Sequence, residues 1–325
     1  MVKGPIGHRI HLCLAALVAA SPLLAASPAD LAQARQFYEL TDYESSLRIL
    51  QSIQPKDGPV LELIGRNHYM QAEYKKATEI LEKAVSADPA NAEYELWLGR
   101  AFGRRAETAS PFTAPSNAGK ARQHFEKAVQ LDSRNMDALS DLFEYYLEAP
   151  GFMGGGLDKA ESIASRLDRI NPARAHELRA AIAESRNDDG TAEHELKLAI
   201  ETSPHPAFQW SVLASFYEHR KRWPEMEDAI NNCASSAATD RTAGVALYDG
   251  AGVLIRARRD PELAAKMLQD YLGGNSKTEE APAFVAHYRL ARLLNQLGDR
   301  NGAQREQAAG YALASEYRPP QDAKH

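Results

Sequence analysis

The sequence predicts an all-α fold made of stacked pairs of antiparallel helices. Apolar residues recur at helical spacing along the 325 residues, and no stretch alternates in the way that a half-buried β-strand does. A small residue returns on every second predicted helix, at intervals close to one repeat unit. One such unit cannot bury its apolar face alone, whereas a stack of units shares a continuous core. These observations indicate an α-solenoid.

The stretch Gly58–Asn91 shows the unit most clearly. Its first helix carries an apolar stripe that includes Gly65, and its second helix begins near Tyr74. The pair Asp88-Pro89 ends the second helix, because proline has no amide donor for the next turn. The offsets of large and small residues predict that the two helices approach closely at Gly65 and Ala77.

Four units occupy the first half of the chain, each with an inward stripe on two helices. In order, the stripes are Ala34 and Phe37 with Tyr43, Leu47, Leu50 and Ile53; Leu61 and Ile64 with Ala77, Leu81 and Ala84; Trp97, Leu98 and Phe102 with Ala121, Phe125 and Ala128; and Leu139, Leu142 and Phe143 with Ala160, Ile163 and Leu167. Inserted loops are expected at residues 107–119 and 149–156, because their prolines and glycines interrupt the helical pattern.

Four more units follow in the second half. Their stripes are Leu178, Ala181 and Ile182 with Leu196, Ala199 and Ile200; Trp210, Leu213 and Tyr217 with Met226, Ile230 and Cys233; Tyr248, Gly252 and Ile255 with Leu263, Ala264 and Leu268; and Tyr288, Leu290 and Leu294 with Ala303. The last helix is expected to continue over residues 304–317. Polar residues on its outer side fit the cap that a solenoid needs for solubility.

One position in each second helix marks the register of the units. Small residues occupy it in seven units, and a methionine occupies it in the sixth. The eight positions are Ser46, Ala77, Ala121, Ala160, Ala192, Met226, Ala264 and Ala303.

The N-terminus has the pattern of a secretory signal peptide, which we place at residues 1–26. Lys3 and Arg9 accompany an apolar run, and small residues near Ala26 suit cleavage. An uncleaved anchor or an amphipathic first helix are the alternatives. We expect an exported protein, periplasmic if the source is a Gram-negative bacterium and otherwise secreted, with no stable membrane span after cleavage. Only Cys233 then remains, so no internal disulfide is expected.

Charge argues against nucleic acid as the main partner. The formal net charge is −6, and after residue 26 the chain has 36 basic and 44 acidic residues. Phosphate backbones are bound by clustered cations, which this mild acidity does not provide.

These motifs give the chain after residue 26 a resemblance to the tetratricopeptide-repeat (TPR) superfamily, and with the N-terminal pattern it looks like signal-bearing bacterial TPR proteins. The resemblance implies a right-handed α-solenoid of about eight TPR-like repeats over residues 27–318, with a C-terminal capping helix and a disordered tail at 319–325. It also implies that the first helix of each repeat lines a concave groove.

Residues of that groove follow from the same resemblance. The candidates for partner binding are Glu62, Arg66 and Tyr69 in the second repeat, Arg100 and Arg104 in the third, and Ser140, Glu144 and Glu148 in the fourth. The three arginines suit a carboxylate or an acidic peptide, because guanidinium groups form forked hydrogen bonds. The neighbouring acids suit a basic segment of the same partner. The alternative is that all these charges form a solvated helix face.

The glycine-rich loop is a second candidate surface, formed by Phe152, Met153, Gly154, Gly155 and Gly156. Glycine amides before a helix can hold an anion, but Lys159 is followed by Ala160, so the phosphate-loop motif is incomplete. A structural turn and a partner-binding loop remain as interpretations.

No catalytic residue, metal site or cofactor is expected. His176-Glu177 and His194-Glu195 begin like zinc-protease helices, but Ala180 and Leu198 stand where the second histidine would be. Cys233 fits a small core residue.

The leading functional hypothesis is therefore an exported, non-enzymatic adaptor that binds a protein or peptide in its groove, in cell-envelope assembly or secretion. The alternatives are a self-assembling structural solenoid and, less favoured, a small-ligand receptor built on the inserted loops. The sequence leaves the partner and the oligomeric state open.

Overall fold

The fold consists of eight antiparallel helix pairs. The structure, a computed structural model, describes residues 28–275 and 277–315, and these ranges contain no β-strand. The helices are α1 (Pro28–Glu39), α2 (Tyr43–Ser52), α3 (Gly58–Met70), α4 (Tyr74–Ala87), α5 (Ala92–Glu107), α6 (Ala114–Leu131), α7 (Met136–Glu148), η1 (Gly151–Met153), α8 (Leu157–Leu167), α9 (Pro172–Ser185), α10 (Asp189–Thr202), α11 (Ala207–His219), α12 (Trp223–Ala237), α13 (Gly244–Ala257), α14 (Pro261–Gly273), α15 (Ala283–Gln296) and α16 (Arg300–Leu313). The prediction of an all-α repeat fold is confirmed.

The predicted register of the repeats is also confirmed. All eight marker positions lie on the second helix of a pair, and all are buried, with at most 2% of each residue exposed: Ser46, Ala77, Ala121, Ala160, Ala192, Met226, Ala264 and Ala303. Small side chains at these points let the two helices of a repeat, and the next repeat, approach closely.

Helix ends follow local side-chain chemistry. Asn91, Asn135 and Asn171 precede α5, α7 and α9, and each side-chain oxygen accepts from a backbone amide of the first turn, for example Ala138 N at 2.9 Å from Asn135 Oδ1. Such caps satisfy amides that have no partner within the helix. The repeats therefore begin at fixed residues, which keeps the stripes in register.

Gly65 is the closest approach within the second repeat. A Cβ built at Gly65 would lie 2.5 Å from Leu81 Cγ on α4, a separation that packed carbon atoms do not adopt. Gly99 meets Phe125 in the same way in the third repeat, at 2.7 Å. The tight helix contact predicted at Gly65 is therefore present, with Leu81 as its nearest partner.

The first inserted loop is shorter than predicted. We expected residues 107–119 to be non-helical, but α5 extends to Glu107 and α6 already begins at Ala114. Pro115 lies in the first turn of α6, where a missing amide costs no hydrogen bond, so it starts a helix here and does not break one. The second loop, 149–156, is present as predicted and contains only the short helix η1.

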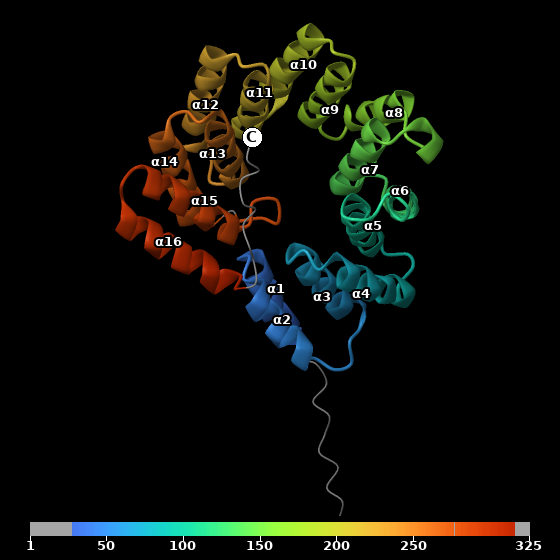
Figure 1. Cartoon of the computed structure of the whole chain (residues 1–325). Helices are drawn as coiled ribbons and strands as arrows, with labels where there is room; N and C mark the ends of the chain where they lie inside the picture. The colour runs from blue at the N-terminus through green and yellow to red at the C-terminus, as the bar shows by residue number, and fades with distance from the viewer. Residues whose placement is uncertain (1–27, 276, 316–325) are drawn as a thin grey trace, which may run out of the picture.

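The helix pairs curve into a closed ring (Figure 1), in which α1 and α2 lie beside α15 and α16. Tyr43 on α2 packs against Phe284 on α15 with ring centroids 6.0 Å apart, and both side chains are buried. Ala34, Leu47 and Ala314 belong to the same apolar cluster. The first and last repeats thus share one core.

Hydrogen bonds join the same two repeats. The Ala283 amide donates to Thr41 Oγ1 at 3.0 Å, and Thr41 is buried. The amide and hydroxyl of Ser315 both donate to Glu44 Oε1, each at 2.7 Å. α16 keeps an exposed polar outer face as the last helix of the stack, while the residues around it close the ring.

The signal peptide predicted at 1–26 and the tail predicted at 319–325 lie outside the described residues. Among the helices of the described ranges, none has the length and apolarity needed to cross a membrane.

Gly65→Ala should destabilise the protein, by about 1–3 kcal/mol in free energy of unfolding, because the added methyl group overpacks the contact with Leu81. Gly103→Ala in α5 is the control: no atom lies within 4 Å of its Cβ position, so it should gain about 0.5–1 kcal/mol from helix propensity. Urea denaturation measures both. Equal effects of the two substitutions would contradict the contact.

Candidate functional site

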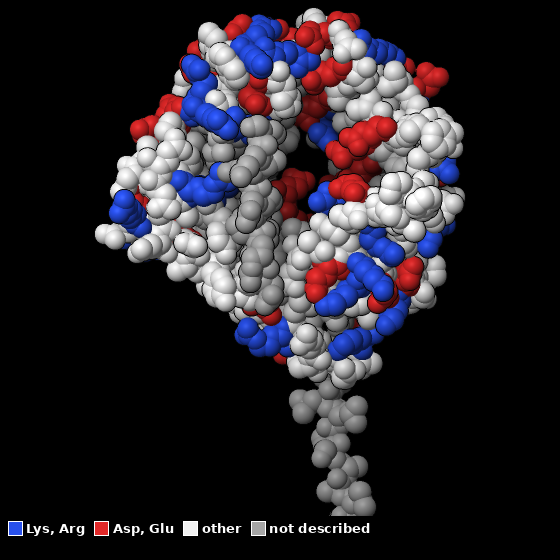
Figure 2. All heavy atoms as spheres, viewed as in Figure 1, with Lys and Arg blue, Asp and Glu red and all other residues white. Residues whose placement is uncertain are grey.

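The inner wall of the ring gathers charged residues from helices that are distant in sequence. It is formed by the first helices of the repeats, including α3, α5, α7, α9 and α13, and by the segment 277–282 that precedes α15. Figure 2 shows an opening at the centre of the ring, bordered by acidic and basic side chains. We call this surface the lumen.

Arg66 on α3 is the most heavily contacted residue of the lumen. It pairs with Glu62 at 2.7 Å and with Glu279 of the segment before α15, 213 positions later in the chain. Its Nε donates to Tyr38 Oη at 3.3 Å, and its guanidinium lies 4.8 Å and 4.4 Å from the ring centroids of Tyr38 and Trp97. Arg66 therefore links the first, second, third and last repeats.

Glu62 is buried beside Arg66, with only 2% of the residue exposed. Burial raises the pKa of the Glu62 carboxyl, and the positive charge of Arg66 partly opposes that rise. A second cation, Arg35 on α1, lies 3.7 Å from the same carboxylate. Both arginines stabilise an acid that would otherwise be costly to bury.

The other arginines of the lumen are also paired. Arg100 on α5 donates to Asp141 at 2.5 Å and lies 3.5 Å from Asp137, and its guanidinium is 4.8 Å from the Trp97 ring centroid. Arg174 on α9 donates to Glu177 at 2.8 Å. Its Nε also donates to Ser140 Oγ, at 3.2 Å.

Four acids of this surface have no such partner. Within the described residues, no cationic nitrogen lies within 4 Å of the carboxylates of Glu144, Glu148, Asp249 or Glu280. Burial and the charge of Asp141 raise the pKa of Glu144, and burial and Asp137 raise that of Glu280. Burial and the nearby Glu280 raise the pKa of Asp249 to about 6. The unmatched charge of the lumen is therefore negative.

Four of the predicted groove residues form one cluster. Arg66, Arg100 and Tyr69 contact the ring of Trp97, Tyr69 edge-to-face at 5.4 Å, and Glu62 pairs with Arg66. Arg104 stands apart: it pairs with Glu107 and contacts Tyr74, and it is exposed. The three predicted arginines thus do not form one open cationic site, because Arg66 and Arg100 already hold carboxylates of the same chain.

Sequence reasoning missed five residues of the lumen: Asp141, Arg174, Asp249, Glu279 and Glu280. The first two could have been found from helical spacing, since Asp141 follows the predicted Ser140 and Arg174 lies on the next first helix. Nothing in the sequence indicates that Glu279 reaches Arg66, because that contact depends on closure of the ring.

The glycine-rich loop is a tight turn in this structure. Gly154 and Gly156 have φ of 91° and 148°, and a Cβ at Gly155 would lie 1.8 Å from the Ala149 carbonyl oxygen. Tyr145 Oη donates to the Met153 carbonyl at 2.9 Å, while Phe152 is 89% exposed. The three glycines are explained by backbone geometry, and Phe152 is the only one of the five candidates here with an exposed apolar side chain.

The remaining reactive side chains have structural partners. His176 Nδ1 lies 2.6 Å from Glu195 Oε2, so these two residues bind each other. Cys233 is buried, and burial raises the pKa of its thiol to about 12. No group of three or more His, Cys, Asp or Glu side chains in residues 28–275 and 277–315 is arranged to hold a metal ion.

Comparisons with known proteins found similarity to solved structures alone. No family model matches the sequence, and no curated protein matches it. Among solved structures, a thermophilic TPR protein from Thermus thermophilus is similar at a TM-score of 0.49 and 18% identity, over 58% of this chain and 97% of that one. MamA protein is similar at a TM-score of 0.41 and 21% identity, over 54% of this chain and 90% of that one. A chain of the APC/C hetero-tetramer Cut9–Hcn1 is similar at a TM-score of 0.40 and 13% identity, over 89% of this chain and 53% of that one. The chain resembles TPR proteins.

Asp249→Asn should stabilise the protein at neutral pH. The folded state holds a proton on this carboxyl up to about pH 6, above its ordinary pKa of 3.8. Between these values the folded state binds more protons than the unfolded state, so the free energy of unfolding falls as pH rises. The substitution should remove that loss. It should raise the free energy of unfolding by about 1–3 kcal/mol at pH 7.5 and leave it almost unchanged at pH 4.

Urea denaturation at the two pH values measures this effect. Asp270→Asn is the control, because Asp270 is exposed and pairs with Lys266 at 2.5 Å on α14. It should change the free energy of unfolding by no more than about 0.5 kcal/mol at either pH. A loss of stability for Asp249→Asn at pH 7.5 would contradict the assigned burial of an ionised acid.

Proposed function

We propose that this protein is an exported, non-enzymatic scaffold that holds a basic segment of a partner protein in its lumen. The observation that carries the proposal is the charge balance of the inner wall. Arg66, Arg100 and Arg174 are matched by acids of the chain itself, whereas Glu144 and Glu280 are not. A lysine or arginine side chain supplied by a partner would relieve the repulsion among these acids.

The shape of the wall supports a peptide-like ligand. Curved helical repeats present an extended concave surface, and such surfaces bind extended or helical segments through side-chain anchors. Here the partly exposed ring of Tyr69, which packs on the buried Trp97, offers an apolar contact on the same wall. A partner segment would combine basic residues with one apolar or aromatic anchor.

Two alternative functions have less support. End-to-end assembly of solenoids needs free terminal repeats, and in the ring the first and last repeats cover each other. A receptor built on the inserted loops would need convergent polar groups, whereas the loop at 149–156 is explained by its turn geometry. Export, with a role in envelope assembly or secretion, rests on the N-terminal sequence pattern alone.

The test uses a fluorescent peptide of alternating lysine and alanine, with a glutamate–alanine peptide for comparison. We expect the basic peptide to bind and the acidic peptide not to bind in fluorescence anisotropy, with affinity that falls as salt rises. Glu144→Lys combined with Glu280→Lys should weaken binding of the basic peptide at least about tenfold, because two attractive charges become repulsive.

The matched control is Glu79→Lys with Glu82→Lys, which changes the net charge equally on the exposed outer side of α4. It should leave the affinity within about twofold, and circular dichroism should show that both double variants keep their helices. If both weaken binding equally, or if the acidic peptide binds better, the lumen is not the site.

A further inference from the structure

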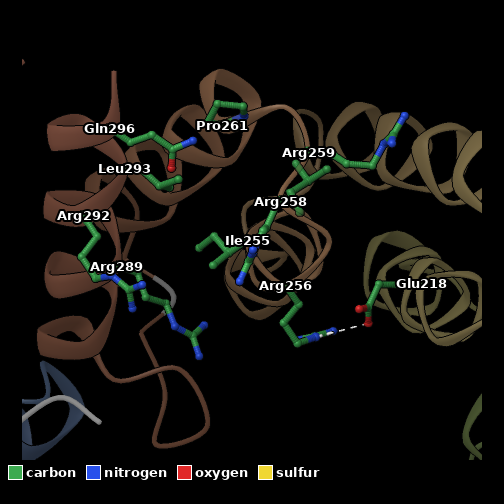
Figure 3. Close-up of a pocket in the computed structure, with 11 residues that line it drawn as sticks. Glu218, Ile255, Arg256, Arg258, Arg259, Pro261, Arg289, Arg292, Leu293 and Gln296 are labelled. Atoms are coloured by element: carbon green, nitrogen blue, oxygen red, sulfur yellow. Dashed lines mark hydrogen bonds and ion pairs between the residues drawn. The ribbon is translucent and has the colours of Figure 1, made fainter. Parts of the chain in front are cut away.

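A separate cleft in the last two repeats is lined mainly by arginine. It lies between α13, the start of α14 and α15, with a volume of about 650 Å³. Figure 3 shows its lining residues. Five are arginines and, among the described residues, Glu218 is the only acid. We call it the arginine cleft, and its arginines are Arg256, Arg258, Arg259, Arg289 and Arg292.

Two of the guanidinium groups converge on a single point. Arg256 comes from α13 and Arg289 from α15, and the Nη1 atom of each lies 3.5 Å from the position that a Cβ at Gly252 would occupy. No other atom apart from the helix's own nearby backbone lies within 4 Å of that position. Gly252 itself is buried, so these two cations from different helices lie over its backbone.

Close packing against a neighbouring helix does not require a glycine at Gly252. A Cβ at Gly65 or Gly250 would clash with Leu81 or Met267 at 2.5 Å, so a glycine is needed at both positions. At Gly252 a methyl group would make only ordinary contacts, although glycine within a helix lowers stability relative to alanine. The absence of a side chain at Gly252 lets the guanidinium groups of Arg256 and Arg289 converge close to the backbone of α13.

Neighbouring side chains hold both Arg256 and Arg289 in position. Arg256 donates to Glu218 and to Ser215 Oγ, each at 3.3 Å, from Nε and Nη2. The Arg289 guanidinium lies 4.3 Å from the ring centroid of Tyr248 on α13. Contacts of this kind fix a long side chain without consuming all its donors.

Positive charge is in excess here. In the described part of the chain, no carboxylate lies within 4 Å of the Arg258 or Arg289 guanidinium. Asp249 also interacts with Arg256 and Arg289, and with a pKa of about 6 it is ionised at neutral pH and offsets part of their charge. Arg258 and Arg289 remain without a carboxylate in direct contact, whereas Arg256 and Arg259 pair with Glu218 and Glu227.

We propose that the arginine cleft binds a small phosphate-bearing anion, with one phosphate group held by Arg256 and Arg289. A phosphate group carries up to two charges and accepts forked hydrogen bonds from several guanidiniums, whereas a single carboxylate matches only one. The cleft volume is in the range of small-molecule sites and exceeds what one phosphate ion fills. The remaining arginines then contact a second anionic group of the ligand.

Isothermal titration calorimetry of the whole protein with pyrophosphate tests this site, with citrate and acetate as carboxylate probes. We expect one saturable site for pyrophosphate, weaker binding of citrate, and none of acetate. Absence of a saturable site for pyrophosphate overturns the proposal. Citrate binding at least as tight as that of pyrophosphate overturns the assignment to phosphate.

Three variants localise the site. Arg289→Gln should weaken pyrophosphate binding at least about tenfold, because it removes a charged donor. Arg256→Gln should weaken binding to a similar extent, because it removes the second guanidinium group that holds the same phosphate. Arg169→Gln is the control, since Arg169 is an exposed arginine after α8 and no carboxylate of the described residues lies within 4 Å of it. Equal losses for Arg169→Gln and Arg289→Gln, or unchanged binding in Arg256→Gln, would contradict the site.

Discussion

The contact between the first and last repeats constrains everything else in this structure. Tyr43 and Phe284 bury their rings against each other, and Ala283 and Ser315 donate hydrogen bonds to Thr41 and Glu44. An open solenoid exposes two terminal repeats and a groove with free edges. Closure covers both terminal surfaces, turns the groove into a lumen, and brings Glu279 of the last repeat to Arg66 of the second.

Closure also sets the electrostatics of the lumen. Glu279 meets Arg66 only because the segment before α15 crosses to α3, and Glu280 then adds its charge to those of Asp137 and Asp249. Arg100 and Arg174 pair with acids of the next repeat and of their own helix, while several other acids have no such partner. The arginine cleft has the opposite charge, because α13 and α15 bring five arginines together with one acid, Glu218. The ring thus carries surfaces of opposite sign on neighbouring repeats.

Local patterns predicted the repeats, and the reason is physical. Positions such as Ala77 and Ala264 must be small wherever two helices cross, so spacing alone located them, and both are fully buried. The placement of Glu62, Arg66 and Arg100 on the inner wall followed from the resemblance to TPR proteins, which implies that the first helix of each repeat lines the groove. The predicted length of the first loop was wrong, because a proline that interrupts one helix can also begin the next, as Pro115 does in α6. Ring closure could not be predicted, because it results from small rotations accumulated over eight repeats, and no single residue encodes it. The contact of Glu279 with Arg66 and the proximity of Glu280 to Asp137 depend on that closure and were missed with it.

The most direct measurement of the central claim is the distance between the first and last repeats in solution. Spin labels at Arg48→Cys on α2 and Ala312→Cys on α16 would report it by double electron–electron resonance, in a Cys13→Ser background. Both sites are exposed, and native Cys233 is buried and should not react. Ring closure predicts a single narrow distribution at short distance. A broad distribution at long distance, as an open solenoid would give, would contradict the closed ring and the lumen built on it.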